Sequence, residues 1–226
     1  ALYDEIVKAY LGGIDSAYKL KPILGNTCPF EASERRHLLS LLGAHMQQIR
    51  VGSSDASTDG NILISMPDLA QLLVPGIEAM QQAGKVKSAH TAAELLGELL
   101  HHIASRSGLL IPRSSDEHGN TVYSFTHLSF LEFFAAEWLG REFDRLQKRL
   151  ARQAEAMADE MTLSEADLDR EFPAPQSIEH KRSDFPKLAA SPVWHEPLIF
   201  LVESRKSDTT TLLRWLFPEL HSNKPY

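Results

Sequence analysis

The stretch that most constrains the fold is residues 123–139, YSFTHLSFLEFFAAEWL, which changes from a strand pattern to a helix pattern within a few residues. Apart from Glu132 and Glu137, apolar side chains surround nearly the whole helix: Phe130, Leu131, Phe133, Phe134, Ala135, Trp138 and Leu139. A helix that is apolar on all sides is buried on most of them. The rest of the chain must therefore build a core around this helix.

The segment before this helix predicts a further helix and then a β-hairpin. Thr91 and Glu94 stand at capping-box spacing, and apolar residues follow at helical spacing until Gly108. The runs 109–113 and 121–125 flank the polar turn SSDEHGN, which is typical of two antiparallel strands.

A short strand and another helix precede these elements. Residues 62–65 have a strand pattern, and Ser65 then caps a helix with Pro67 in its first turn. The dipeptide Pro-Gly at 75–76 is expected to kink or split this helix. Strand, helix, helix and hairpin is the order of a winged helix-turn-helix, which we place at 62–126.

Helices flank this module on both sides. Helices are expected at 2–12, at 31–50 and at 129–158, the last with a capping box at Ser129. A short helix capped by Ser164 and a Pro-rich connection at 173–187 follow. The last two expected helices are 193–204 and 209–217. The predicted fold class is mainly α: a winged helix-turn-helix with a small β-hairpin, flanked by helical-bundle or helical-hairpin segments. The predicted domains are a helical segment (1–61), the winged helix (62–126), and a long helix plus a helical domain (127–226). The predicted core comprises Leu95, Leu99, Ile103, Phe125, Phe130, Phe134 and Trp138.

Composition and charge limit the function classes. The chain of 226 residues has a net charge of −7, which argues against nucleic-acid binding because phosphates must be neutralised by Lys and Arg. No apolar run approaches the ~20 residues needed to span a bilayer, and no signal-peptide pattern begins the chain. The single cysteine, Cys28, fits a reducing compartment, so we expect a cytoplasmic location. The chain has no initiating Met, which indicates a piece of a longer protein.

The chain contains none of the common catalytic motifs. It lacks the P-loop pattern GxxxxGK[ST], and it also lacks GxGxxG, GxSxG and HExxH. His101 and His102 would point about 100° apart on a helix and so could not chelate one ion together. Cys28 has no evident base nearby in the sequence. We therefore expect no catalytic residue, no metal and no cofactor held by this chain alone.

His127 stands where the strand pattern meets the apolar helix. The free N–H groups and the dipole at a helix start suit an anion, and a histidine there can donate a hydrogen bond to a phosphate. Alternatively, the ring bonds a nearby carbonyl and packs against the hairpin. The spacing alone favours this second interpretation.

The sequence GLLIPRSSDEHGNTVYSFTHLSFLEFFAAEWL resembles the end of the winged-helix domain of NACHT-type signal-transduction NTPases, a group of the STAND class that includes NOD-like receptors and bacterial defence proteins. The family pattern is Gly-Leu-Leu, a hairpin and then F-x-H-x-x-[FL]-x-E-[FY]-[FLA]-A-A. It is fitted by Gly108, Leu109, Leu110, Phe125, His127, Phe130, Glu132, Phe133, Ala135 and Ala136. The stretches ALYDEIVKAYL and VWHEPLIFLVES are similar to family helices that precede and follow this domain.

The resemblance implies a regulatory role and not a catalytic one. It places the Walker motifs upstream of the chain, so ADP or ATP would be bound by the full-length protein. It also implies that His127 touches the β-phosphate of ADP and so stabilises an inactive state. The implied partner is the upstream nucleotide-binding domain in cis, and self-oligomerisation on activation stays open.

Two alternatives remain. A winged-helix DNA-binding regulator would use 91–106 as its recognition helix, but Glu94 and Glu98 lie on its polar face, and Asp116 and Glu117 lie at the hairpin tip. A plain helical interaction scaffold would differ from the leading hypothesis in having no P-loop upstream.

Overall fold

The computed structural model describes residues 2–13, 28–52, 62–159, 161–172, 180–205 and 207–221. Internal contacts group the chain into two compact units, Ala1–Ala135 and Ala136–Tyr226. The boundary between the units falls within the long helix α6 (Leu128–Ala158). The three-part division predicted from the sequence stays a prediction.

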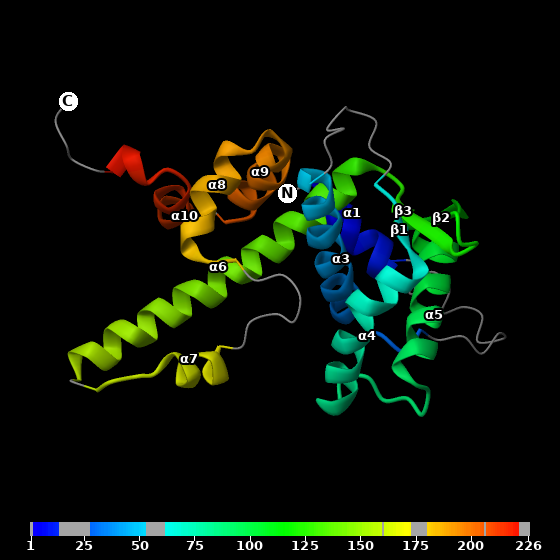
Figure 1. The fold of residues 1–226 in the computed structure, drawn as a ribbon, viewed down its shortest axis with the longest axis horizontal. Helices are drawn as coiled ribbons and strands as arrows, with labels where there is room; N and C mark the ends of the chain where they lie inside the picture. The colour runs from blue at the N-terminus through cyan, green and yellow to red at the C-terminus, as the bar shows by residue number, and fades with distance from the viewer. Residues whose placement is uncertain are drawn as a thin grey trace. The chain divides into compact units, whose positions relative to one another are not determined.

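The first unit is mainly helical with one small sheet, as predicted. Its elements are α1 (Leu2–Lys8), η1 (Ala9–Gly13), α3 (Ala32–Gly52), β1 (Ile64–Ser65), α4 (Met66–Gln82), α5 (Ala92–His102), η2 (Ile103–Ser107), β2 (Leu110–Ser115), β3 (Thr121–Phe125) and the start of α6. Figure 1 shows α3, α4 and α5 side by side, with the sheet beyond one end of α5. This is a winged helix-turn-helix arrangement with an added helix.

The sheet is antiparallel, in the order β1-β3-β2. The predicted hairpin pairs Leu110 with Phe125, and the short strand ahead of α4 pairs Ile64 with Tyr123. The hairpin turn is closed by Asp116, whose carboxylate accepts from the backbone N–H groups of His118 (2.9 Å) and Asn120 (2.8 Å). The hydrogen bonds of the turn residues therefore favour the same hairpin that the pairing of β2 with β3 shows.

Helix α4 is not split at the Pro-Gly dipeptide at 75–76, since it runs without a break from Met66 to Gln82. Its cap is as predicted, because the Ser65 hydroxyl accepts from the backbone N–H of Asp68. Pro75 lies inside the helix at an exposed position. Because a proline has no N–H, the carbonyl of Gln71 lacks its hydrogen bond within the helix, and Gln71 is exposed as well. Water can therefore bond that carbonyl, while the opposite face of α4 stays packed in the core.

Two helix boundaries differ from their predictions. The capping box of Thr91 and Glu94 is present at the start of α5. The α-helix ends at His102, and the π-helical turn η2 follows it as far as Gly108, which has a φ of 61°. Helix α6 begins at Leu128, so Ser129 lies inside its first turn and is not the cap. The backbone N–H of Phe130 donates to the carbonyl of His127 at 3.1 Å, which makes His127 the residue at the helix boundary.

The seven side chains predicted to form the core are all buried: Leu95, Leu99, Ile103, Phe125, Phe130, Phe134 and Trp138. Six of them belong to the first unit, and Trp138 belongs to the second. The rings of Phe125 and Phe134 stack with centroids 5.6 Å apart, so the end of β3 packs directly on the second turn of α6.

Helix α3 meets the start of α6 at a glycine. A Cβ atom built on Gly43 would lie 2.7 Å from the Cβ of Phe134, 2.9 Å from the backbone N of Ala135 and 3.0 Å from the carbonyl O of Leu131. These distances are shorter than real Cβ contacts allow. The two helix backbones therefore approach as closely as they do only because residue 43 lacks a side chain.

The second unit consists of short helices and the rest of α6. The short helices are α7 (Glu165–Glu171), η3 (Arg182–Asp184), α8 (Phe185–Ala190), η4 (Pro192–Trp194), α9 (His195–Ser204), α10 (Thr209–Leu216) and η5 (Pro218–His221). Phe143, Phe185 and Trp215 form its aromatic core, with ring centroids 4.7–6.0 Å apart.

Helix α8 was missed by the sequence analysis, which assigned 173–187 to a Pro-rich connection. Residues 173–179 lie outside the described part of the chain, but Pro186 stands in the first turn of α8, where a proline is tolerated. The buried ring of Phe185 anchors the helix on Phe143 and Trp215.

A buried polar cluster lies beside this aromatic core. Glu142, which is 1% exposed, pairs with Arg145 and accepts a hydrogen bond from the backbone N–H of His180 at 3.3 Å. The His180 ring is also buried, 6.1 Å from the ring of Trp194, and its Nδ1 has no hydrogen-bond partner among the described residues.

Acid should weaken the second unit through His180. Burial of the ring lowers the pKa of His180 below its ordinary value of 6.5, although Asp184 partly opposes the shift. The unfolded chain therefore takes up this proton at a higher pH than the folded chain does. The contribution of His180 to stability is fully present above about pH 6.5 and is lost as the pH falls below that value.

Thermal unfolding between pH 5 and pH 7.5 tests this expectation. The melting temperature of the wild type should fall more steeply on acidification than that of His180→Phe, which keeps the backbone donor to Glu142. His45, whose pKa is also lowered by burial, is common to both proteins and cancels in the comparison. Parallel pH profiles of the two proteins would contradict the assignment.

Candidate functional site

The join between β3 and α6 is held in a fixed conformation by Thr126. Its backbone N–H donates to the carbonyl of Leu109 at 3.0 Å, and its hydroxyl donates to the carbonyl of Gly108. Gly108 has the left-handed conformation that a side chain rarely adopts, which turns the chain from η2 into β2. The next residue, His127, is thereby fixed at the N-terminus of α6.

His127 is exposed at this N-terminus. Its ring lies 6.1 Å from the ring of Phe130 at an angle of 47°. Among the described residues, neither ring nitrogen has a hydrogen-bond partner. The hydrogen bond to a nearby carbonyl, which the sequence analysis left open, is therefore not formed within this part of the chain.

The surroundings of His127 can accept an anion. Helix α6 has 31 residues and no acidic residue in its first turn. The first N–H groups of a helix have no partner within it, and the dipole favours negative charge there. Together with an imidazole N–H, this arrangement could donate hydrogen bonds to a phosphate. Nucleotide contact by His127 stays a prediction.

Two contacts that the sequence analysis missed hold the start of α6. Arg50, near the end of α3, donates to Glu132 at 2.9 Å, and Glu132 is 7% exposed. The rings of Tyr3 and Tyr10 both lie edge-on to Phe130, with centroids 6.1 and 5.9 Å away. Nothing in the local sequence signals these pairs, since their members are more than 80 residues apart.

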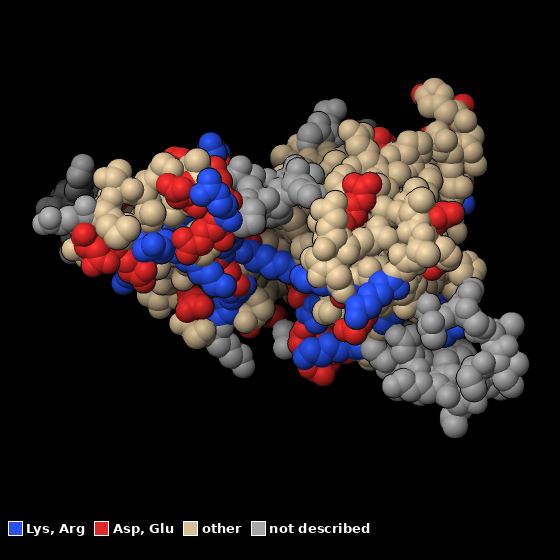
Figure 2. Space-filling model, turned by 90° about the horizontal axis from the view of Figure 1, so that it is seen from below, with Lys and Arg blue, Asp and Glu red and all other residues tan. Residues whose placement is uncertain are grey.

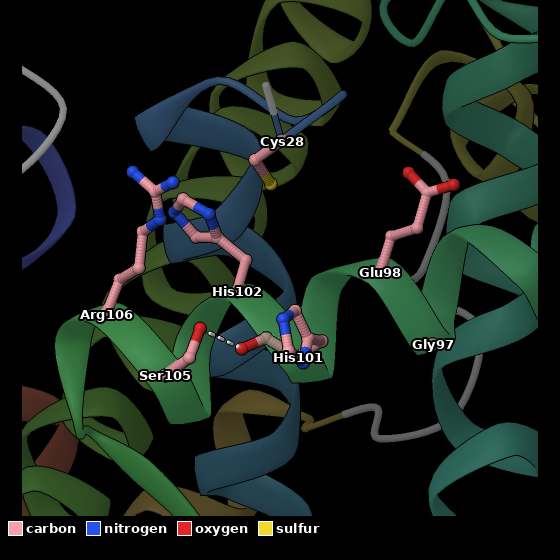
Figure 3. Close-up of a pocket in the computed structure, with 7 residues that line it drawn as sticks. All are labelled: Cys28, Gly97, Glu98, His101, His102, Ser105 and Arg106. Atoms are coloured by element: carbon pink, nitrogen blue, oxygen red, sulfur yellow. Dashed lines mark hydrogen bonds between the residues drawn. The ribbon is translucent and has the colours of Figure 1, made fainter. Parts of the chain in front are cut away.

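A second polar site lies on the outer side of α5. It is a pocket of about 280 Å³ lined by Cys28, Gly97, Glu98, His101, His102, Ser105 and Arg106. Figure 3 shows Glu98, His102 and Arg106 on the side of the helix where Cys28 lies. No group of three or more His, Cys, Asp or Glu residues that could hold a metal ion occurs in the described ranges.

The buried Arg35 contacts His102, one of the residues that line this pocket. Its guanidinium lies 2.7 Å from Nε2 of His102, and it donates to the carbonyl of Leu11 at 2.5 Å. Arg35 is 2% exposed and joins three elements, which are α3, α5 and η1. Sequence reasoning considered His102 only to exclude joint metal chelation with His101, and it missed this structural partner.

The face of α5 that would enter a DNA groove is poorly suited to phosphates. Glu94 is engaged in the helix cap, and Glu98 pairs with His90 at 2.5 Å. Asp116 and Glu117 occupy the hairpin tip. On the face drawn in Figure 2, Lys and Arg lie side by side with Asp and Glu. These charges give no support to the DNA-binding alternative.

The fold and the join at His127 define the class of the first unit as a winged helix-turn-helix. A family model, described as the winged helix-turn-helix domain C-terminal to NACHT, matches residues 1–139. The chain belongs to this family, and its first part is therefore the region that follows a NACHT domain in cis. It is not a catalytic NTPase domain.

The other comparisons add nothing to this assignment, since no curated protein and no solved structure matches the chain. In the ranges that the structure covers, none of the helices combines the length and the apolar character that a membrane crossing requires.

Proposed function

We propose that this chain is the regulatory part of a NACHT-type signalling NTPase of the STAND class, and that it stabilises the ADP-bound inactive state of the upstream nucleotide-binding domain. The observation that carries the proposal is the exposed ring of His127 at the N-terminus of α6, with no partner among the described residues. A contact that forms in one nucleotide state and breaks in another is what a switch requires.

The residues near His127 suit one contact to a phosphate but not a complete nucleotide site. The chain has no P-loop, so the ADP would be bound mainly by the NACHT domain, with His127 adding a hydrogen bond to the β-phosphate. In this proposal the chain has no enzymatic activity of its own. Self-oligomerisation on activation and a cytoplasmic location belong to the same proposal.

Replacing His127 should leave the fold of this chain nearly unchanged. We expect His127→Leu to shift the free energy of unfolding by less than about 0.5 kcal/mol, since the ring is exposed and forms no hydrogen bond among the described residues. Phe130→Ala, three residues later and buried, should instead lower the melting temperature by many degrees. A large loss of stability in His127→Leu would show that the residue is structural.

The same variant tests the function in the protein that contains both domains. There, His127→Leu should weaken the inactive state by about 1–3 kcal/mol, the usual scale of a coupling energy. The measurement is the release rate of labelled ADP, together with the ADP affinity of the isolated chain, which should be weaker than micromolar. Unchanged ADP release would exclude the phosphate contact.

A further inference from the structure

The second half of α6 carries a row of arginines that is covered by α7. The stretch RLQKRLARQ at 145–153 contains four basic residues and no acidic one. Arg145, Arg149 and Arg152 follow one another at spacings of four and three residues, which places them on one face of the helix. We call these three residues the arginine face. In the structure α7 lies against it (Figure 1).

Each arginine of this face has a partner in or directly after α7. The pairs are Arg149 with Glu165 and Asp169, Arg152 with Glu171 at 3.4 Å, and Arg145 with the carbonyl of Phe172 at 3.4 Å. The side chain of Arg149 is only 14% exposed, whereas its two partners are 75% and 62% exposed. A short acidic helix therefore fits the arginine face, because α7 already does so.

Few contacts hold α7 in this place. Leu168 is 1% exposed, and every other residue of α7 is exposed. Ion pairs with solvated carboxylates contribute little to stability. A helix of seven residues is also too short to be stable without a partner. We therefore expect α7 to leave α6 and unfold locally far more often than the aromatic core of the second unit opens.

When α7 leaves, the arginine face and the place of Leu168 become accessible together. A phosphate backbone could pair with the arginines, but it has no apolar group for the place of Leu168. An acidic amphipathic helix supplies both the carboxylates and the apolar side chain.

We propose that the arginine face is a recognition site for an acidic amphipathic helix of a partner protein, with a leucine between its carboxylates. Helix α7 occupies this site until the partner displaces it. The site lies beyond residues 1–139, which the family model matches, and it does not depend on the contact of His127 with a nucleotide.

Hydrogen exchange in the full chain measures the release of α7 without any substitution. The amides of residues 168–171 should exchange about tenfold faster than those of α10, which is held by three buried side chains. The exchange of α7 should accelerate severalfold between about 0.05 and about 0.5 M NaCl, because salt screens the ion pairs, and α10 should not respond. Equal, salt-independent exchange in the two helices would overturn the proposal.

A labelled peptide with the sequence of residues 162–172 tests the recognition. Leu168→Ser removes the apolar contact of α7, which otherwise competes at a high effective concentration. The peptide should therefore bind this variant about tenfold more tightly than the wild type. Absence of binding to Leu168→Ser would contradict the proposal. Melting curves show that the variant is folded, and the exchange experiment decides the matter if it is not.

The charge on the arginine face has a matched control in the next residue. Arg149→Glu, added to Leu168→Ser, should abolish binding of the peptide. Lys148→Glu makes the same change of charge, but Lys148 is exposed and pairs with none of the α7 carboxylates among the described residues, so its effect should be much smaller. Equal effects would reduce the site to general charge attraction and exclude a specific arginine face.

A short DNA duplex distinguishes the two kinds of acidic partner. It should bind the Leu168→Ser chain about tenfold more weakly than the peptide does, since it offers nothing to the place of Leu168. Binding of the duplex as tight as that of the peptide would replace the acidic helix by a nucleic acid and so refute the proposed partner.

Discussion

Gly43→Ala is expected to destabilise the first unit by about 1–3 kcal/mol or more, through overpacking between α3 and α6. The new Cβ would lie 2.7 Å from the Cβ of Phe134 and 2.9 Å from the backbone N of Ala135. Neither atom is the far end of a flexible side chain that could rotate away. The helices must therefore separate, which also disturbs the packing of Phe125 on Phe134.

Gly97→Ala is the matched control for this substitution. Gly97 lies on the exposed side of α5, and a Cβ there would meet no heavy atom within 4 Å. Alanine is the better helix former, so a gain of about 0.5–1 kcal/mol is expected. Denaturant unfolding of both variants should give free-energy changes of opposite sign. A neutral Gly43→Ala would show that α3 and α6 are less closely packed than the structure indicates.

Phe143→Ala should produce the largest loss of stability in the second unit, about 3–5 kcal/mol. Its fully buried ring contacts Trp215 at 4.7 Å and Phe185 at 6.0 Å, so truncation removes the centre of the aromatic core. Hydrogen exchange should accelerate in α8, α9 and α10. The measurement is unfolding monitored by exchange and by the near-ultraviolet signal of the tryptophans.

Leu213→Ala is the control for removing a large apolar side chain from this unit at an exposed position. Leu213 lies on α10 but is 36% exposed, so Leu213→Ala should lower the free energy of unfolding by much less than Phe143→Ala does. Similar losses from the two substitutions would mean that Phe143 is not the centre of this core.

The sequence predicted well those elements whose signals are local. The hairpin follows from its turn residues, and the start of α5 follows from Thr91 and Glu94, which bond each other in the structure. The burial of α6 follows from its apolar circumference alone. Each of these signals lies within a few residues of the element that it predicts.

Contacts between distant residues could not be predicted in this way. The pair of Arg50 and Glu132 joins residues 82 positions apart, and Arg205 donates to the carbonyl of Gly140 across 65 positions. Gly43 looks like an ordinary helix glycine until the partner helix is placed against it. A single sequence carries no signal for such pairs, because each residue is also acceptable on a solvated surface.

The candidate site was located from the sequence, but its surroundings were not. His127 was identified from its place between strand and helix. The helical spacing of residues 2–12, in contrast, did not indicate that the ring of Tyr10 is exposed. The cap of α6 was assigned to Ser129 from the pattern of a serine followed three residues later by a glutamate. In the structure the hydrogen bonds of Thr126 hold the join, and the helix boundary lies at His127, two residues before Ser129.

The contact between Arg35 and His102 determines where the imidazole proton lies. A guanidinium has donors only and does not lose its proton in proteins, so Nε2 of His102 must offer a lone pair to Nη1 of Arg35. The neutral ring therefore exists as a single tautomer, with its hydrogen on Nδ1. At this other nitrogen, His102 can therefore act only as a hydrogen-bond donor, because the contact with the buried Arg35 fixes the position of the proton.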